Sequence, residues 1–391
     1  MSARIFGTAF AVLTLLACGT GDIGTPPGTN PDDDEPETFS VEGLAPSKTR
    51  TYLEKLAPPL VGRVLTPYEQ QQIEADGGKA IEPIVKAWAT EPGLVSAARA
   101  MMEEKLSVSG ETPDIDYSLP GNLVEHVVKT NAPWSDILTA PSCYGRDGNV
   151  VACDSGAPFT AGVLTTRGYL AARASRFNLT RSSTLLRAFA CQSYPQDDSI
   201  QPRVPPEKLR HLFSITDLSQ ADPEEIASAA NPDHPCHDCH GQFAAHAQLF
   251  VKFDQEGIYR PEATGEQDPD GELGRSFNGL MTSHFKEPAD MASEKSQMFG
   301  TEVNNLAEAA HVLSDDPLFL QCSAQNLLEY TLRIDTAGPL GKTVDKDMLA
   351  RIADTASAES AEPTFPEIVA ATFTDPDVVR TVVGALAGDD E

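Results

Sequence analysis

The sequence has little positive charge and few long apolar runs. Against 58 Asp and Glu it holds only 29 Lys and Arg, which gives a formal net charge of -29. Nucleic-acid phosphates and anionic lipid surfaces repel a chain this acidic, so we expect no nucleic-acid partner, and any partner attracted by charge should be basic. Apolar residues still make up 40% of the 391 positions, enough for a hydrophobic core, so the composition excludes a fully disordered chain.

Residues 5–17 form the one long apolar run, and they are too few to span a bilayer, which takes about 20 residues. The run follows Arg4 and ends in Leu-Leu-Ala directly before Cys18. This pattern predicts a lipoprotein signal peptide over residues 1–17, with Cys18 as the lipidated residue after cleavage. The alternative is an ordinary signal peptide with an incidental cysteine. Because Gly19 and not Asp follows the cysteine, we expect a lipid anchor in the outer membrane, facing the periplasm or the cell surface.

Composition and periodicity divide the rest of the chain into four regions. Residues 18–42 are rich in Gly, Pro, Thr and Asp and predict a disordered tether. Residues 43–140 form an N-terminal helical region, residues 141–335 a haem c-binding domain for the reason given below, and residues 336–391 a C-terminal helical segment. Because strand-like alternation is nearly absent, the expected fold class is all-α, with a cytochrome c-like region and long irregular loops.

Several helices can be placed from local signals. The run Thr66-Pro67-Tyr68-Glu69 combines a capping box with proline at the first helical position, which predicts a helix start. Two apolar sets recur at helical spacing and are interpreted as core faces: Ile81, Ile84, Val85 and Trp88, then Leu94, Ala97, Ala98, Met101 and Met102. Further helices are expected at Leu164–Arg173, Ser183–Cys191, Asn304–Leu313, Pro317–Leu332, Asp345–Ala356 and Asp377–Leu386. Residues 254–298 are rich in glycine and predict a long irregular segment.

The run Cys236-His237-Asp238-Cys239-His240 has the spacing of a covalent haem c attachment motif. In this chemistry, Cys236 and Cys239 bind the two vinyl groups of the porphyrin, and His240 is the proximal iron ligand. Composition alone predicts roughly 0.003 occurrences of this motif by chance. Haem c is also attached outside the cytoplasm, which agrees with the export signal.

Two other readings of the same residues stay open. Cys236 and Cys239 have the spacing of a thiol–disulfide redox pair, although no strand-then-helix setting surrounds them. A zinc site is also conceivable, since these cysteines and two of four nearby histidines are suitable ligand types. The four histidines are His234, His237, His240 and His246.

The remaining cysteines predict disulfides. The sequence has seven, and setting aside Cys18 and the two of the motif leaves an even number, which suits an exported chain. Cys143 and Cys153 lie 10 residues apart across a Gly/Asp turn and are expected to pair. Cys191 is then left to pair with Cys322.

The sixth ligand of the iron decides what the haem does, since Met or His suits an electron carrier and an open position permits chemistry on peroxide or oxygen. Met298 is the leading candidate, because it precedes Phe299-Gly300 and a predicted helix. That order is similar to the ligand loop of class I cytochromes c. The other candidates are Met281, Met291, His246, His284 and His311, or no protein ligand at all.

Several short runs between about residues 161 and 333 form one pattern. They are Gly162-Val163-Leu164-Thr165, Leu185–Cys191, Cys236–His240, Phe253-Asp254, Gly257-Ile258-Tyr259-Arg260, Phe299-Gly300, Leu306-Ala307, Cys322 and Leu327–Leu332. In these runs the chain resembles the planctomycete-type cytochrome c proteins of bacterial envelopes, with their associated uncharacterised domains. The resemblance implies haem c and an envelope location more than any substrate.

Two functions of different classes follow as hypotheses. The first is a non-enzymatic electron carrier with one haem c, no catalytic residue and redox proteins as partners. The second is a haem enzyme, a peroxidase or oxygenase, with Arg260, Arg275 or His284 near an open iron. Bacterial cytochrome peroxidases carry two attachment motifs and this chain carries one, which favours electron transfer. A third hypothesis is a structural envelope protein in which haem only joins helices.

Overall fold

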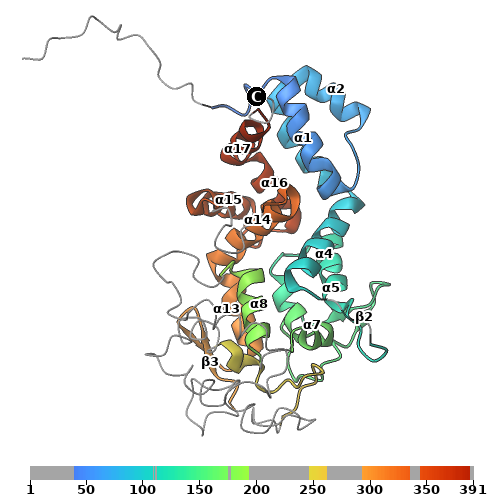
Figure 1. Ribbon diagram of the computed structural model, residues 1–391, viewed down its shortest axis with the longest axis vertical. Coiled ribbons are helices and arrows are strands. Elements are labelled where there is room, and N and C mark those ends of the chain that lie inside the picture. Colours follow the sequence, from blue (N-terminus) through green and yellow to red (C-terminus); the bar gives the residue numbers. More distant parts are fainter. Residues whose placement is uncertain are drawn as a thin grey trace, which may run out of the picture. The chain divides into compact units, whose positions relative to one another are not determined.

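A computed structural model of the protein describes residues 39–108, 110, 112–174, 178–192, 246–261, 293–334 and 344–387 (Figure 1). In the first half of the chain the elements are α1 Pro46–Val61, α2 Pro67–Asp76, η1 Gly77–Ala80, α3 Ile81–Trp88, α4 Pro92–Leu106, α5 Leu119–Lys129, α6 Asp136–Thr139, β1 Cys143–Tyr144, β2 Val150–Val151, η2 Gly162–Thr165, α7 Arg167–Ala172 and α8 Leu179–Phe189. The second half holds η5 Gln248–Phe250, β3 Ser296–Met298, β4 Thr301–Val303, α13 Leu306–Asp315, α14 Pro317–Leu332, α15 Lys346–Glu359, α16 Phe365–Thr374 and α17 Pro376–Ala387. These elements are mostly helical, as the all-α expectation requires.

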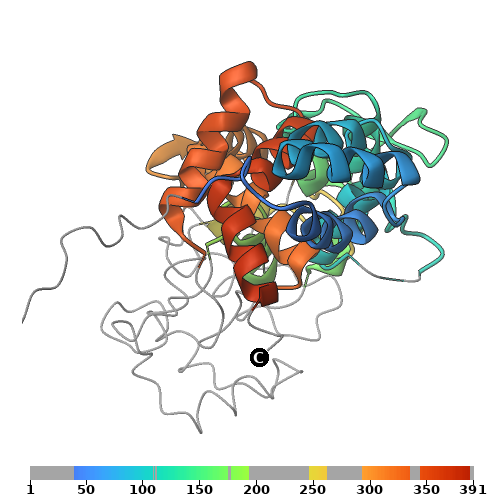
Figure 2. The ribbon, with the colours of Figure 1, turned by 90° about the horizontal axis from the view of Figure 1, so that it is seen from above.

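One hydrophobic core joins helices from distant parts of the sequence. α4 packs on α5, α3 packs on α16, and α1 contacts both α14 and α17, so the first and last helices lie side by side (blue and red in Figure 2). The core runs from Tyr52 on α1 to Val383 on α17. Both apolar sets expected between Ile81 and Met102 are buried in it. The N-terminal, middle and C-terminal regions expected from the sequence therefore share this core.

Local capping explains where two of the helices begin. At α2, the hydroxyl of Thr66 accepts from the backbone N–H of Glu69, and the Glu69 carboxylate accepts from the backbone N–H of Thr66. This confirms the predicted capping box. At α16, the backbone N–H of Thr364 donates to the Glu367 carboxylate in the same way. Sequence analysis missed α16, although Thr-Phe-Pro-Glu carries the same threonine, proline and glutamate signals as the start of α2.

The helices before the haem motif differ from expectation in their bounds. The single helix predicted at Leu164–Arg173 is broken at Thr166, whose hydroxyl accepts from Tyr169 N–H and caps α7. α8 begins four residues earlier than the predicted Ser183 and ends before Cys191, which has a positive φ of 50°. That left-handed backbone turns the chain away from the helix axis at the residue that forms the disulfide.

Short antiparallel hairpins occur where only irregular chain was expected. β1 pairs with β2, and β3 pairs with β4. The expectation that Met298 lies in a loop was wrong, because Met298 is the last residue of β3 and pairs with Thr301. Phe299 and Gly300 both have positive φ, which is the backbone of a tight two-residue hairpin turn.

Glu69 joins α2 to its surroundings through a nearly buried carboxylate that is 6% exposed. The guanidinium of Arg63 donates to both carboxylate oxygens at 2.8 Å, and the indole N–H of the buried Trp88 donates at 2.7 Å. Burial alone would raise the pKa of Glu69, but the hydrogen bonds from Arg63, Thr66 and Trp88 outweigh it and lower that pKa to about 2. The charged carboxylate therefore stabilises the fold.

Glu69→Gln should reduce the free energy of unfolding by up to about 3 kcal/mol at neutral pH, because the ionised form is favoured in the folded protein. The folded pKa lies below the unfolded value of about 4.5, so this contribution is complete above pH 4.5 and is lost as the pH falls towards 2. Urea denaturation of both proteins across this range measures it. Glu74→Gln, at an exposed position of the same helix, is the matched control and should cost less than about 1 kcal/mol. A loss from Glu69→Gln that did not shrink with acid would contradict this account.

Candidate functional site

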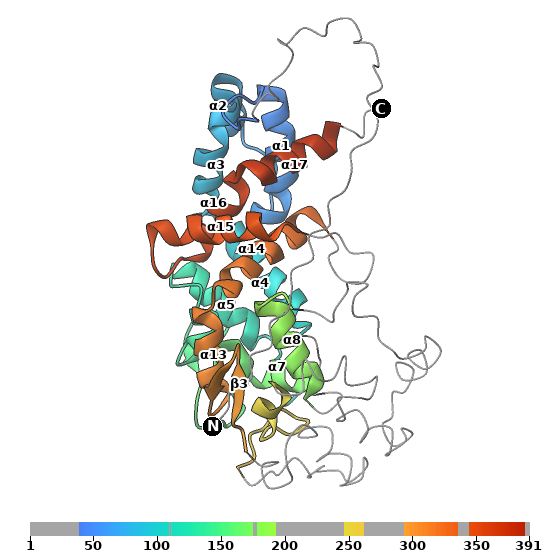
Figure 3. The ribbon, with the colours of Figure 1, turned by 90° about the vertical axis from the view of Figure 1, so that its left-hand side faces the viewer.

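The attachment motif Cys236–His240 lies outside the described residues, and so does Cys18. The described chain flanks the motif on both sides, ending at Gln192 and resuming at His246. Helix α8 leads into the first flank at Cys191 and bonds to the second through Asn178 and Arg181. It lies beside α7 in the lower part of the fold (Figures 1 and 3). The site is therefore described from the residues that hold the ends of the motif segment.

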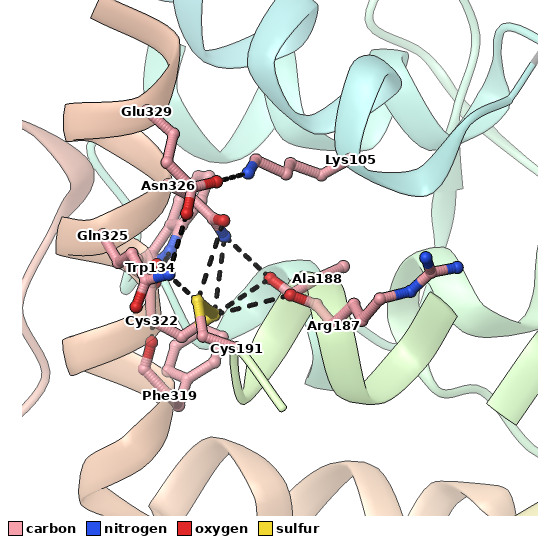
Figure 4. Close-up of a disulfide and its surroundings, with 11 residues drawn as sticks. Lys105, Trp134, Arg187, Ala188, Cys191, Phe319, Cys322, Gln325, Asn326 and Glu329 are labelled. Atoms are coloured by element: carbon pink, nitrogen blue, oxygen red, sulfur yellow. Dashed lines mark hydrogen bonds and ion pairs between the residues drawn. A yellow bond between two sulfur atoms is a disulfide. The ribbon is translucent and has the colours of Figure 1, made fainter. Parts of the chain in front are cut away.

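The disulfide between Cys191 and Cys322 fixes the end from which the motif segment departs (Figure 4). Cys322 lies on α14 and is buried, and the two Cα atoms are 5.1 Å apart. One helical turn further along α14, the Asn326 side-chain amide donates to the carbonyl of Ala188 on α8 at 2.8 Å. Together these contacts join the C-terminal end of α8 to α14.

The second disulfide, between Cys143 and Cys153, closes the β1–β2 hairpin region. Its Cα atoms are also 5.1 Å apart. Both pairings predicted from the cysteine count are thus confirmed. Just after this disulfide, the carbonyl of Ser155 accepts from the backbone N–H of Tyr259 at 2.7 Å. The hairpin region therefore contacts the chain that follows the motif.

Arg181, on α8, binds the chain that follows the motif. Its side chain is 1% exposed, and the guanidinium donates to the carbonyls of Phe253 at 2.9 Å and Asp254 at 2.5 Å. It also donates to the Leu170 carbonyl and to the Asn178 side-chain oxygen. Burial lowers the pKa of Arg181 to about 10, although Tyr169 and Asp254 act in the opposite direction. The cation thus pairs with carbonyl dipoles and not with a carboxylate in contact.

The turn at residues 253–260 is built around one aspartate. Asp254 Oδ1 accepts from the backbone N–H groups of Glu256 and Ile258 at 3.0 and 2.9 Å, and Oδ2 accepts from Arg260 Nε at 2.8 Å. Gly257 follows with a φ of 77°, and a Cβ atom there would lie only 2.9 Å from the carbonyl oxygen of Arg167. The turn therefore needs glycine both for its backbone conformation and for its close approach to α7.

Tyr259 connects this turn to the segment before β3. Its hydroxyl donates to Glu294 Oε2 at 2.8 Å, and its ring packs edge-on against the rings of Phe159 and Phe253. Burial raises the pKa of Glu294, and its other oxygen, Oε1, is buried without a hydrogen-bond partner. The amide of Gln248 also donates to the Ser293 carbonyl. Both ends of the stretch 262–292 are thus held at the same turn.

The structure places some predicted ligands and leaves others outside its described ranges. Met298 is 0% exposed and belongs to the hydrophobic core, while His311 is exposed on α13 and His246 is half-buried. Arg260, proposed for a haem enzyme, already pairs with Asp254. The candidates that lie outside the described residues are Met281, Met291, His284, Arg275, His234 and His237.

Arg181 and Glu294 were missed by sequence analysis. Arg181 binds carbonyls 72 and 73 residues away, and main-chain acceptors leave no trace in the sequence. The sequence did not indicate a role for Glu294 either, because its hydrogen-bond partner Tyr259 lies 35 residues before it.

The chain matches no family model, no curated protein and no solved structure. The resemblance to planctomycete-type cytochromes therefore stays a prediction that rests on the motifs. No helix in the described part of the chain is long and apolar enough to cross a membrane. Within the same part, no three His, Cys, Asp or Glu side chains gather to hold a metal ion.

Gly257→Ala should destabilise the protein more than Gly148→Ala, which is its matched control. Both glycines have nearly the same φ, 77° and 78°, so alanine pays the same left-handed backbone cost of about 1–2 kcal/mol at each. Nothing lies within 4 Å of a Cβ atom at Gly148, whereas at Gly257 it meets Arg167 and Leu170 at 2.9 Å. We expect an additional loss of about 1 kcal/mol or more at Gly257, measured by urea denaturation. Equal losses would show that the contact with α7 is loose.

Removing the two disulfides should have unequal effects on stability. The Cys191–Cys322 bridge closes 131 residues and the Cys143–Cys153 bridge closes 10. The chain-entropy model gives about 5 kcal/mol for the first and about 3 kcal/mol for the second. Urea denaturation of the two double Cys→Ala variants under non-reducing conditions should therefore show the larger loss for the pair at positions 191 and 322. The opposite order would mean that the long loop is already restricted in the unfolded state.

Proposed function

We propose that the protein is a lipid-anchored c-type cytochrome of the cell envelope that transfers electrons through one covalently bound haem. The cysteine count is the observation that carries the proposal. Both disulfides form from Cys143, Cys153, Cys191 and Cys322, so the only other cysteines are Cys18 and the pair within the motif. Every cysteine then has one role: lipidation, a disulfide, or attachment of haem.

The donor set of the motif fits haem c. Cys236 and Cys239 would form the two thioether bonds, and His240 would be the proximal ligand of the iron. When bound, the haem supplies reversible one-electron transfer. The chain's own contribution is to hold the ends of the motif segment, through the disulfide at Cys191 and through the contacts of Arg181. These contacts hold the described chain on both sides of the motif to α8.

Haem attachment can be tested directly. The protein is expressed in a host that matures cytochromes c, separated on a denaturing gel and stained for haem. We expect a stained band from the wild type and none from the Cys236→Ala/Cys239→Ala variant. Cys143→Ala/Cys153→Ala also removes two cysteines and is the matched control that should keep the stain. An unstained wild-type band would overturn the proposal and would favour a thiol pair or a zinc site.

Met298 is the proposed sixth ligand, and Met298→Leu separates this role from simple core packing. Leucine nearly conserves volume, so stability should change by less than about 1.5 kcal/mol in either case. Loss of the thioether should remove the long-wavelength band of methionine-ligated ferric haem and let carbon monoxide bind the ferrous form. Met101→Leu is the control, since Met101 is also buried, at 1% exposure, and should leave the spectrum unchanged. An unchanged spectrum in Met298→Leu would reduce Met298 to a core residue.

A haem enzyme is the second candidate, and Glu294 is the observation that favours it. The side chain is half-buried, burial raises its pKa, and one carboxylate oxygen is buried without a hydrogen-bond partner. A group of this kind can hold a proton beside a reacting site. Peroxide turnover by the wild type that falls in Glu294→Gln would support this candidate over electron transfer.

The lipid anchor and the partner follow from the sequence and have their own tests. Cys18→Ala should move the protein from the detergent phase to the aqueous phase in a detergent-partition experiment, because the acyl chains are lost. The net charge of -29 favours a basic redox partner. Such an association should slow as ionic strength rises.

A further inference from the structure

The Cys143–Cys153 disulfide borders an open cavity of about 470 Å³. Its two cysteines differ in access, because Cys143 is fully buried whereas Cys153 is half-buried and lines the cavity. The other walls are mostly apolar and include Pro141, Val151, Phe159 and Ile258. A cavity of this volume is in the range that admits small molecules. A small molecule that enters it would therefore meet Cys153 and not Cys143.

The Cys191–Cys322 disulfide is surrounded by oxygen atoms (Figure 4). Cys322 is 1% exposed, and the carbonyl oxygens of Arg187 and Ala188 lie 3.7 and 3.6 Å from its sulfur. The side-chain oxygen of Asn326 lies 3.8 Å from Cys191 Sγ. A thiolate that approached these sulfurs would meet the negative ends of three dipoles, which repel it. The two disulfides should thus differ in their reactivity towards thiols.

The chain from Cys153 to Ser155 connects the first disulfide to two other segments. The carbonyl of Cys153 accepts from the backbone N–H of Arg167 at 3.0 Å, at the start of α7. The carbonyl of Ser155 accepts from the backbone N–H of Tyr259 at 2.7 Å, in the turn at residues 253–260. Asp154, between them, has a positive φ of 63°, which is uncommon for a residue other than glycine, and the three residues form no helix or strand.

Cys143 belongs to a part of the structure that is packed on a helix. It is the first residue of β1, and the ring of the next residue, Tyr144, stacks on that of His126 of α5 with the centroids 3.5 Å apart. The disulfide therefore ties the loop segment Cys153–Ser155 to α5 through β1. Breaking it should release the loop segment and leave Cys143 in place.

We propose that Cys143–Cys153 is a thiol-exchange site, at which a small dithiol attacks Cys153 through the cavity and releases the segment that binds Tyr259. The thiolate of the dithiol bonds to Cys153 Sγ as the bond between the two protein sulfurs breaks, and Cys143 leaves as a thiolate that takes up a proton. The second thiol then loses its proton and displaces Cys153, which is protonated in turn. The protein gains two electrons and two protons, and the reagent becomes a cyclic disulfide. No step involves the haem.

Limited reduction of the full-length, oxidised protein tests the exchange. The protein is treated with dithiothreitol, trapped at intervals with excess N-ethylmaleimide in urea, and analysed by peptide mass spectrometry. We expect Cys143 and Cys153 to be modified at least about tenfold faster than Cys191 and Cys322, because the first disulfide borders the cavity. Equal rates, or faster modification of Cys191 and Cys322, would overturn the proposal.

Two matched variants test which sulfur is attacked. Cys143→Ala and Cys153→Ala lose the same covalent constraint and differ in the thiol that remains. Under native conditions, Cys153 in the first variant should react with iodoacetamide at least about tenfold faster than Cys143 in the second, since Cys143 is buried. If the two thiols react equally fast, the cavity does not select Cys153 and the proposal fails. The limited reduction of the wild type does not depend on either variant folding.

Amide hydrogen exchange tests the release of the loop segment. After selective reduction, the Tyr259 amide should exchange at least about tenfold faster, because its acceptor is the carbonyl of Ser155 on the released segment. The control is the Trp134 amide, which donates to the carbonyl of Pro363 at 2.9 Å and should keep its rate, since neither residue lines the cavity. An unchanged rate for Tyr259 in the reduced protein would overturn the release.

Discussion

The buried guanidinium of Arg181 is the group on which the arrangement around α8 depends. An unpaired charge in a protein interior costs several kcal/mol unless its donors are satisfied. Here the carbonyls of Leu170, Phe253 and Asp254 and the side-chain oxygen of Asn178 satisfy them. These acceptors are correctly placed only when α7, the start of α8 and the turn after the motif are all in position. The cost of the buried charge therefore makes the three segments depend on one another.

A second polar group, Asp254, fixes the conformation of the turn at residues 253–260 that follows the motif. Asp254 organises the turn through two backbone N–H groups and Arg260, while its own carbonyl accepts from Arg181. Gly257 lets this turn approach α7. Phe253-Asp254 and the run from Gly257 to Arg260 are two of the runs that carry the cytochrome resemblance. The structure of this turn explains why these residue types stand there. They hold the chain that follows the motif against α7 and α8.

Sequence predicted those parts of the structure that depend on neighbours along the chain. The Thr66–Glu69 capping box and the buried faces from Ile81 to Met102 follow from spacing within a few residues, and α14 has the predicted bounds. The disulfides followed from an even count of four remaining cysteines and from the short spacing of Cys143 and Cys153 across a turn, which left Cys191 to pair with Cys322. The failures have a common cause. Met298 was placed in a loop because β3 and β4 have only three residues each, too few to show the alternation of a strand, and Arg181 was missed because Phe253 and Asp254, whose carbonyls it binds, are distant in sequence.

Charge connects the fold to the proposed site. The chain is strongly acidic, and several of its described ion pairs join two exposed side chains, where each pair contributes little to stability. Arg181 differs from these pairs, since its guanidinium is buried and is held by three carbonyl oxygens and the side-chain oxygen of Asn178. The disulfide at Cys191 and the contacts of Arg181 hold the described chain on both sides of the motif Cys236–His240 to the same helix, α8.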